Sequence, residues 1–120
     1  DGTISSVRDL VRFPNALPPN ALLAPATRNA AWTQTFAGGM PLPTGLGWFV
    51  QNYHGEPIVW QFGMIRGGYS SLFVKAPNLG LTFIVLANSD GLSAPFQFQL
   101  EAGDVTSSIF ATLFLRLFVP

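Results

Sequence analysis

The sequence predicts an α+β fold, in which an antiparallel β-sheet of about four strands is flanked by N-terminal helices and a C-terminal helix packed on it. Runs of apolar, β-branched and aromatic residues follow one another between positions 46 and 88, and short turns separate them. Both ends of the chain show apolar residues at helical spacing. The length, 120 residues, suits a single domain over positions 1–120.

The first helix is expected to begin after Ser5 or Ser6, because a serine hydroxyl suits the N-cap. Pro14 should end or kink this helix near Phe13, and the segment Pro18-Pro19-Asn20 should stop it.

A second helix is expected from Pro25 to about Gln34, since proline is favoured in a first turn. The Gly- and Pro-rich residues 37–45 predict a loop. Strands are then expected over 46–53, 58–62, 69–76 and 81–88. The fourth is almost continuously apolar, which predicts a central position or cover on both faces.

The last helix should begin near the capping residues 104–107. Its apolar residues repeat at helical spacing and leave only a narrow polar stripe of Ser108, Thr112 and Arg116. A helix that apolar is normally enclosed in a core.

Composition narrows the function classes. Six basic residues balance six acidic ones, which excludes a basic surface for nucleic acid. Charged residues make up 10% of the chain, against about 25% in typical domains. This predicts a surface that is either unusually apolar or partly covered by a partner, and a homodimer is one form of such cover. There is no cysteine, and no apolar run reaches the roughly 18 residues that a membrane span needs.

The common catalytic signatures are missing. Leu72 stands three residues before Lys75, so there is no Ser-x-x-Lys, and Ser70 lacks the closing glycine of a nucleophile elbow. Of Ser70 and Ser71, one should face inward and be hydrogen-bonded. The single histidine, His54, cannot build a histidine metal site and is expected in an exposed turn.

Other polar and aromatic residues have simple structural interpretations. Asp90 and Asp104 are expected as turn and cap residues, and Trp32, Trp48 and Trp60 as core.

Gln61 and Gly63 stand out because they end an otherwise apolar strand and two further glycines follow, Gly67 and Gly68. Bare backbone beside a polar side chain suits an approaching ligand. The alternative is that Gln61 caps the strand and the glycines only form the turn. The spacing leaves both interpretations open.

At these residues the chain resembles the C-terminal part of the serine β-lactamase and penicillin-binding-protein-like family, in its class C β-lactamase, D-aminopeptidase and esterase branch. The likeness covers nearly the whole chain. It rests on the order and spacing of short motifs at 1–10, 45–48, 61–63, 68–71, 77–81 and 85–88.

The resemblance implies roles for four residues. Gln61, Phe62 and Gly63 take the place of the family's third motif and would contact the substrate. The backbone N–H of Met64 would be one of two catalytic oxyanion donors. No metal or cofactor is implied.

The resemblance also implies a helical region before this chain, with a Ser-x-x-Lys nucleophile and a Tyr-x-Asn motif that residues 1–120 lack. The chain is therefore expected to be a segment that partners with the N-terminal remainder of a longer protein. A bacterial, periplasmic or otherwise extracytoplasmic location is implied, but the sequence itself does not fix the compartment.

Gln61 departs from the Lys or His of the family's motif, and a neutral amide can only hydrogen-bond. Two hypotheses follow. The chain is the C-terminal portion of a serine hydrolase acting on an ester, amide or β-lactam, inactive alone, or it is a non-catalytic module that associates through its apolar surface.

Overall fold

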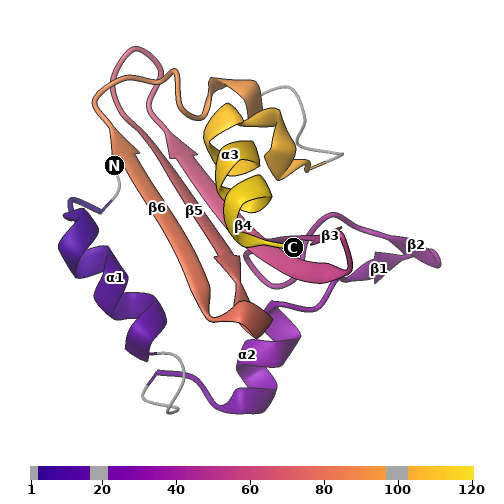
Figure 1. Cartoon of the computed structure of the whole chain (residues 1–120). Coiled ribbons are helices and arrows are strands. Elements are labelled where there is room, and N and C mark those ends of the chain that lie inside the picture. The colour runs from indigo at the N-terminus through magenta and orange to yellow at the C-terminus, as the bar shows by residue number, and fades with distance from the viewer. Residues whose placement is uncertain (1–2, 17–21, 97–102) are drawn as a thin grey trace.

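A computed structural model describes residues 3–16, 22–96 and 103–120 (Figure 1). Within them the α-helices are α1 (Val7–Ala16), α2 (Pro25–Ala31) and α3 (Ile109–Phe118). The strands are β1 (Phe36–Ala37), β2 (Met40–Pro41), β3 (Phe49–Tyr53), β4 (Glu56–Met64), β5 (Ser70–Ala76) and β6 (Leu81–Ala87). Short 3-10 helices are η1 (Pro77–Leu79), η2 (Ala94–Phe96) and η3 (Val105–Ser107).

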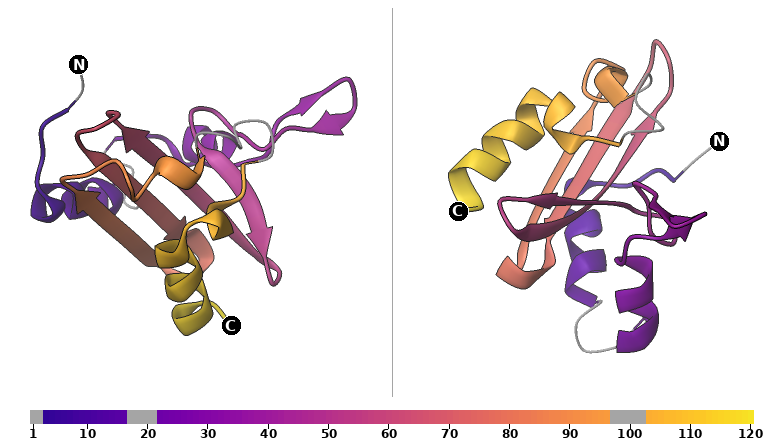
Figure 2. Two further views of the ribbon diagram at one scale, coloured as in Figure 1. Left: turned by 90° about the horizontal axis from the view of Figure 1, so that it is seen from above. Right: turned by 90° about the vertical axis from the view of Figure 1, so that its right-hand side faces the viewer.

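The main sheet has four antiparallel strands in the order β3-β4-β5-β6, and β1 pairs with β2 in a separate ribbon. Figure 2 shows the layers: α3 lies on one face of the sheet, and α1 and α2 lie on the other. The predicted α+β class, with helices packed on an antiparallel sheet of about four strands, is confirmed. None of the helices in the described ranges is long and apolar enough to cross a membrane.

The hydrophobic core lies between the sheet and α3. Because side chains alternate along a strand, the register places Phe49, Trp60, Val74 and Phe83 in one row on the same face. Phe49 stacks on Trp60 with ring centroids 4.4 Å apart, and Phe83 stacks on Phe114 of α3 at 5.0 Å. Trp60 and Val74 are buried. The middle of β4 is therefore held by the most enclosed part of the molecule.

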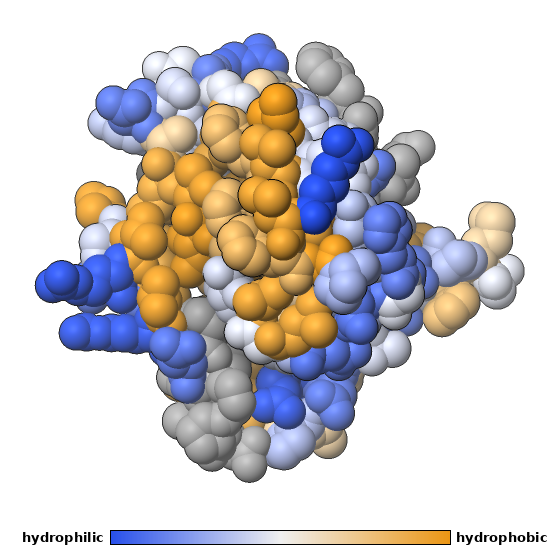
Figure 3. All heavy atoms as spheres, in the orientation of Figure 1, coloured by the Kyte–Doolittle hydropathy of each residue, from blue (hydrophilic) through white to orange (hydrophobic). Residues whose placement is uncertain are grey.

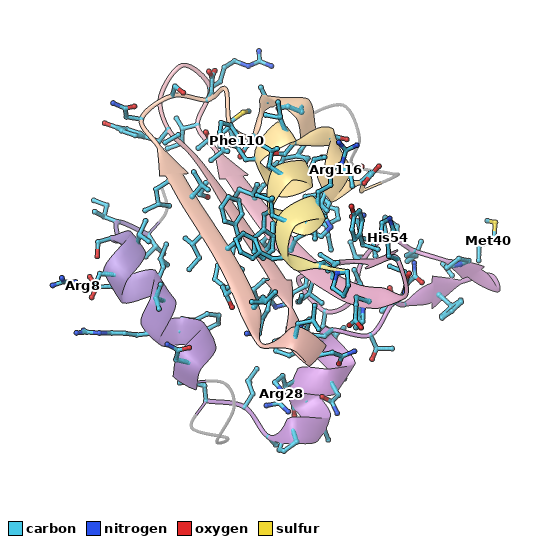
Figure 4. The ribbon with its side chains drawn as sticks, viewed as in Figure 1. Arg8, Arg28, Met40, His54, Phe110 and Arg116 are labelled. Carbon is cyan, nitrogen blue, oxygen red and sulfur yellow. The ribbon has the colours of Figure 1, made fainter. Side chains whose placement is uncertain are left out.

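The hairpin between β3 and β4 has a two-residue turn, His54-Gly55. Both residues have positive φ, 50° and 94°, as the type I′ turn requires. The Asn52 side chain accepts a hydrogen bond from the Gly55 N–H at 2.8 Å. His54, which is labelled in Figure 4, is exposed, and its ring stacks on that of Tyr53, so the predicted turn role is confirmed.

The first helix begins as expected and ends later. The Ser6 Oγ accepts a hydrogen bond from the Asp9 N–H, so Ser6 is the N-cap. The helix passes through Pro14 to Ala16, and the predicted end near Phe13 is wrong. A proline inside a helix lacks the N–H and crowds the carbonyl four residues before it, and α1 ends only two residues after Pro14. The predicted stop at 18–20 lies outside the described residues.

Three boundaries after α1 also differ from the prediction. α2 ends at Ala31, three residues before the expected Gln34. The expected loop at 37–45 contains part of the β1-β2 ribbon. The strand expected from 46 begins at Phe49, because Gly47 has a φ of 76° and turns the chain away. Only Trp60 of the three tryptophans is buried, while Trp32 and Trp48 are partly exposed.

β6 lies at the edge of the main sheet, so of the two predicted alternatives, a central position or cover on both faces, the second holds. Its apolar run is explained by helices on both faces. α1 contacts β6 on one side, and Phe83 meets Phe114 of α3 on the other.

α3 also departs from the prediction. Its N-cap is Ser108, whose Oγ accepts a hydrogen bond from the Ala111 N–H, and Asp104 caps η3 instead. Only one side of α3 is buried, through Ala111, Phe114 and Leu115. We call the outward side the α3 apolar stripe, and Figure 3 shows it as part of a broad hydrophobic surface. Its residues are Ile109, Phe110, Leu113, Leu117 and Phe118.

Candidate active-site wall at the end of β4

β4 continues beyond its neighbour β3. The last residue pair between them is Phe49 with Trp60, whereas β4 runs on to Met64. Gly47, two residues before the start of β3, has a left-handed backbone that keeps the preceding segment out of the strand, because glycine adopts positive φ without steric cost. Gln61 and Gly63 therefore lie within a strand and not at its end, and one edge of residues 61–64 extends past β3.

We call residues 61–64, which extend past β3, the β4 overhang. The Gln61 side chain hydrogen-bonds this overhang to the segment before β3. Its Nε2 donates a hydrogen bond to the Gly47 carbonyl at 2.6 Å, and its Oε1 accepts one from the Phe62 N–H at 3.2 Å. A glutamine amide has two donors and one acceptor oxygen with two lone pairs, so it can satisfy both groups and still hydrogen-bond elsewhere. Gln61 thus takes the place that a β3 residue would occupy in the ladder.

The direction of the Met64 N–H follows from the β4-β5 ladder. The Ile65 N–H donates to the Tyr69 carbonyl at 2.8 Å, so the Ile65 backbone faces the β5 side. Backbone groups of successive residues in a strand point to opposite edges. The Met64 N–H therefore points away from β5, toward the edge that extends past β3. Phe62 has the same direction, which agrees with its bond to Gln61.

Gly63 has no side chain on the face of β4 that carries Gln61. It pairs with Ser71, and a Cβ added to Gly63 would lie 2.8 Å from the Ser71 Oγ. A larger residue would displace that hydroxyl and fill the space over the strand. Gly63 itself is half-buried, with the Ser71 hydroxyl lying over its backbone on the face that carries Gln61.

The Phe62 side chain belongs to the core face. Its ring lies 5.9 Å from Phe49 and 5.0 Å from Phe96 between centroids. Gln61 and Gly63 face the opposite side, so the structure separates the three predicted substrate contacts. A contact between Phe62 and a ligand on the Gln61 side would involve its backbone only.

The loop after β4 is tied to the loop after β6. The Asp90 Oδ2 accepts a hydrogen bond from the Gly67 N–H at 2.8 Å, and the Asp90 carbonyl accepts from Ser93 and Ala94. Asp90 is thus a turn residue, as predicted. The bond holds the glycine-containing loop beside the end of β4.

The serines of β5 have structural partners. Ser70 is buried and its Oγ donates to the Ser89 carbonyl at 2.5 Å. Ser71 points to the opposite face, next to Gly63. The prediction that one serine faces inward and is hydrogen-bonded is confirmed. Within residues 3–16, 22–96 and 103–120 no three His, Cys, Asp or Glu side chains gather as metal ligands would.

Asp104 is a cap, as predicted. It accepts hydrogen bonds from the backbone and the hydroxyl of Thr106 and from the Gln51 Nε2. Burial raises the pKa of the Asp104 carboxyl, but these hydrogen bonds to the charged form outweigh it, and the pKa lies below its ordinary value.

The sequence interpretation missed two features of this face. One is Gly47, whose positive φ creates the overhang. The other is a basic pair, Lys75 on β5 and Arg28 on α2, which lies over Trp32. A lone lysine between Val74 and Ala76 in an apolar strand was the available signal, because a charged residue at such a position is costly unless something compensates it.

The fold defines a class of protein, an α+β domain with helices packed on both faces of an antiparallel sheet. The profile of the Beta-lactamase family matches residues 1–105. The chain therefore belongs to the Beta-lactamase family. Searches of curated proteins and of solved structures found no match.

Proposed function

We propose that this chain is the C-terminal portion of a β-lactamase-like serine hydrolase and forms one wall of its active site. In this proposal the Met64 N–H is one oxyanion donor, and Gln61 and Gly63 flank the substrate. The nucleophilic serine and its lysine come from a preceding region. The reaction is acylation of that serine by an ester, amide or β-lactam, followed by hydrolysis of the acyl-enzyme.

The observation that carries the proposal is the overhang of β4. It directs the Met64 N–H toward the edge of β4 that extends past β3, and it belongs to a chain whose family match covers residues 1–105. A donor placed where negative charge develops stabilises the transition state by roughly 3 kcal/mol. The 120 residues contain no Ser-x-x-Lys.

Gln61 bears on the substrate class. Its amide is engaged with the Gly47 carbonyl and the Phe62 N–H and carries no charge. Substrates without a carboxylate fit this side chain better than those that need a cationic partner. Esters and neutral amides are therefore favoured over β-lactams, and the esterase side of the class C, D-aminopeptidase and esterase branch is favoured.

The test uses a fluorescent phosphonate, which labels activated serines. The 120-residue chain should remain unlabelled and should not hydrolyse p-nitrophenyl acetate above background. A longer protein that includes the preceding region should do both. Labelling of Ser70, Ser71 or another serine of the short chain, located by peptide mass spectrometry, would contradict the proposal.

A second function rests on the α3 apolar stripe. Leu117 is 72% exposed and Ile109 is 68% exposed, and monomers rarely leave such contiguous apolar surface uncovered. We infer association through this stripe, either with the N-terminal remainder of a longer protein or as a homodimer. Sedimentation of the chain at high concentration separates the outcomes, and a monodisperse monomer would count against association between copies.

A further inference from the structure

Lys75 is the only lysine of the chain, and its side chain is buried. Its ammonium donates a hydrogen bond to the Thr82 hydroxyl at 3.2 Å. The ion pair recorded among the described residues joins Arg12 to Asp9, so no carboxylate of those residues reaches Lys75. A buried charge without a carboxylate is unfavourable, and an anion would offset that cost.

A second cation lies close to Lys75. The Arg28 guanidinium carbon lies 5.7 Å from the centre of the Trp32 ring, and the Lys75 Nζ lies 6.0 Å from the same centre. Burial lowers the pKa of Lys75, and repulsion from Arg28 lowers it further. The aromatic face of Trp32 attracts both cations weakly. Two positive groups thus converge on one aromatic ring.

These residues line a cavity of about 570 Å³ between α2, the end of α1 and the sheet. Figure 4 labels Arg28 on α2 at this end of the molecule. Among the described residues, the rest of the lining is neutral and rich in amide groups, from Asn15, Asn29 and Asn78, and includes no acidic side chain. The Glu56 carboxylate lies beside the lining, where its Oε2 accepts a hydrogen bond from the Asn78 Nδ2 at 3.3 Å.

We propose that this cavity binds the oxyanion, a carboxylate or a phosphate, of a small ligand between Lys75 and Arg28, with the body of the ligand against Trp32. Charge-assisted hydrogen bonds to such an anion are the strong ones, and the guanidinium matches its geometry. The volume lies within the range of small-molecule sites.

The cavity is separate from the proposed active-site wall. It contains Val59, which precedes Gln61 by two residues on β4, a distance of about 7 Å along the strand. The proposed role of the Met64 N–H in catalysis can therefore fail without affecting the proposed anion site at Lys75 and Arg28, and the reverse also holds.

The single lysine provides a direct measurement. In the full chain grown with lysine labelled with carbon-13 at Cε, the side chain gives one NMR signal to follow during addition of inorganic phosphate, benzoate or benzamide. Saturable shifts are expected with benzoate or phosphate, with a Kd below about 10 mM. Benzoate should also raise the pKa of Lys75, because an adjacent anion favours the charged form. The neutral benzamide should cause at most a small shift.

Two variants locate the binding. Arg28→Gln keeps the labelled lysine, and it should weaken benzoate binding about tenfold while raising the pKa of Lys75 in the free protein. Bound benzoate should also raise the melting temperature of the unaltered chain, because it binds the folded state only. Lys75→Met should abolish that rise. The control is Arg116→Gln, an exposed arginine on α3 at the opposite face of the sheet, which should bind as the unaltered chain does.

Three results would overturn the proposal. Neither phosphate nor benzoate shifts the Lys75 signal, or benzamide binds as well as benzoate, which would indicate an apolar site only. The third is equal binding by Arg28→Gln and Arg116→Gln, which would place the anion elsewhere.

Discussion

Replacing Gln61 by alanine should detach the overhanging end of β4 from the segment before β3. The substitution removes the donor to the Gly47 carbonyl and the acceptor of the Phe62 N–H. Each hydrogen bond contributes about 0.5–1.5 kcal/mol net. Because Gln61 is half-buried and water can replace part of the loss, we expect the free energy of unfolding to fall by about 1–2 kcal/mol.

The assay is urea unfolding followed by tryptophan fluorescence. With a slope of about 2 kcal/mol per molar urea, the middle of the usual range for a small protein, the midpoint should fall by roughly 0.5–1 M. Gln34→Ala is the matched control, since Gln34 is exposed and no hydrogen bond of its side chain is recorded in the described part of the chain. Amide exchange of Phe62 should also accelerate in Gln61→Ala. Equal midpoints for the two variants would refute the fastening role and leave the Gln61 amide free for a ligand.

Three further outcomes follow. Gly47→Ala should cost about 1–2 kcal/mol through its φ of 76° alone, since no atom lies within 4 Å of the added Cβ, and a neutral effect on thermal unfolding would contradict this. The folded-state pKa of Asp104 lies below its unfolded value, so its contribution is complete above about pH 4 and is lost as pH falls through the folded pKa. Asp104→Asn should therefore show a flatter loss of stability in acid, and parallel pH profiles would argue against it. Leu115→Ala in the core should cost about 2–5 kcal/mol, whereas Leu117→Ser in the α3 apolar stripe should change stability little and reduce self-association in sedimentation.

The order of helices and strands could be predicted because it follows from local patterns. Alternating and continuous apolar runs located β3 to β6, and the helical spacing after Ser108 located α3. The edge position of β6 could not be predicted in this way. A strand has the same apolar sequence whether it lies in the middle of a sheet or at an edge with helices on both faces. β6 is the second case, with α1 and α3 as the helices.

The site could be predicted in part. Gln61 and Gly63 were selected because a polar residue and a glycine interrupt an apolar strand, and the structure places them on one face of an overhanging strand. The partner of Gln61 could not be foreseen, because it is a backbone carbonyl fourteen residues away that depends on the left-handed turn at Gly47. The pair Lys75 and Arg28 was missed because they meet only when α2 docks on the sheet.

The most direct test of the central claim removes the Met64 N–H by substitution with proline, which lacks a backbone N–H. In a longer protein that contains the preceding catalytic region, Met64→Pro deletes this donor, and the β4-β5 ladder should survive because the N–H points away from β5. Met64→Leu is the control. Our account predicts that Met64→Pro lowers kcat for p-nitrophenyl acetate by about 10²–10³-fold relative to Met64→Leu, with KM changed little. Equal kcat values for two folded variants would contradict the assignment of β4 as the oxyanion wall.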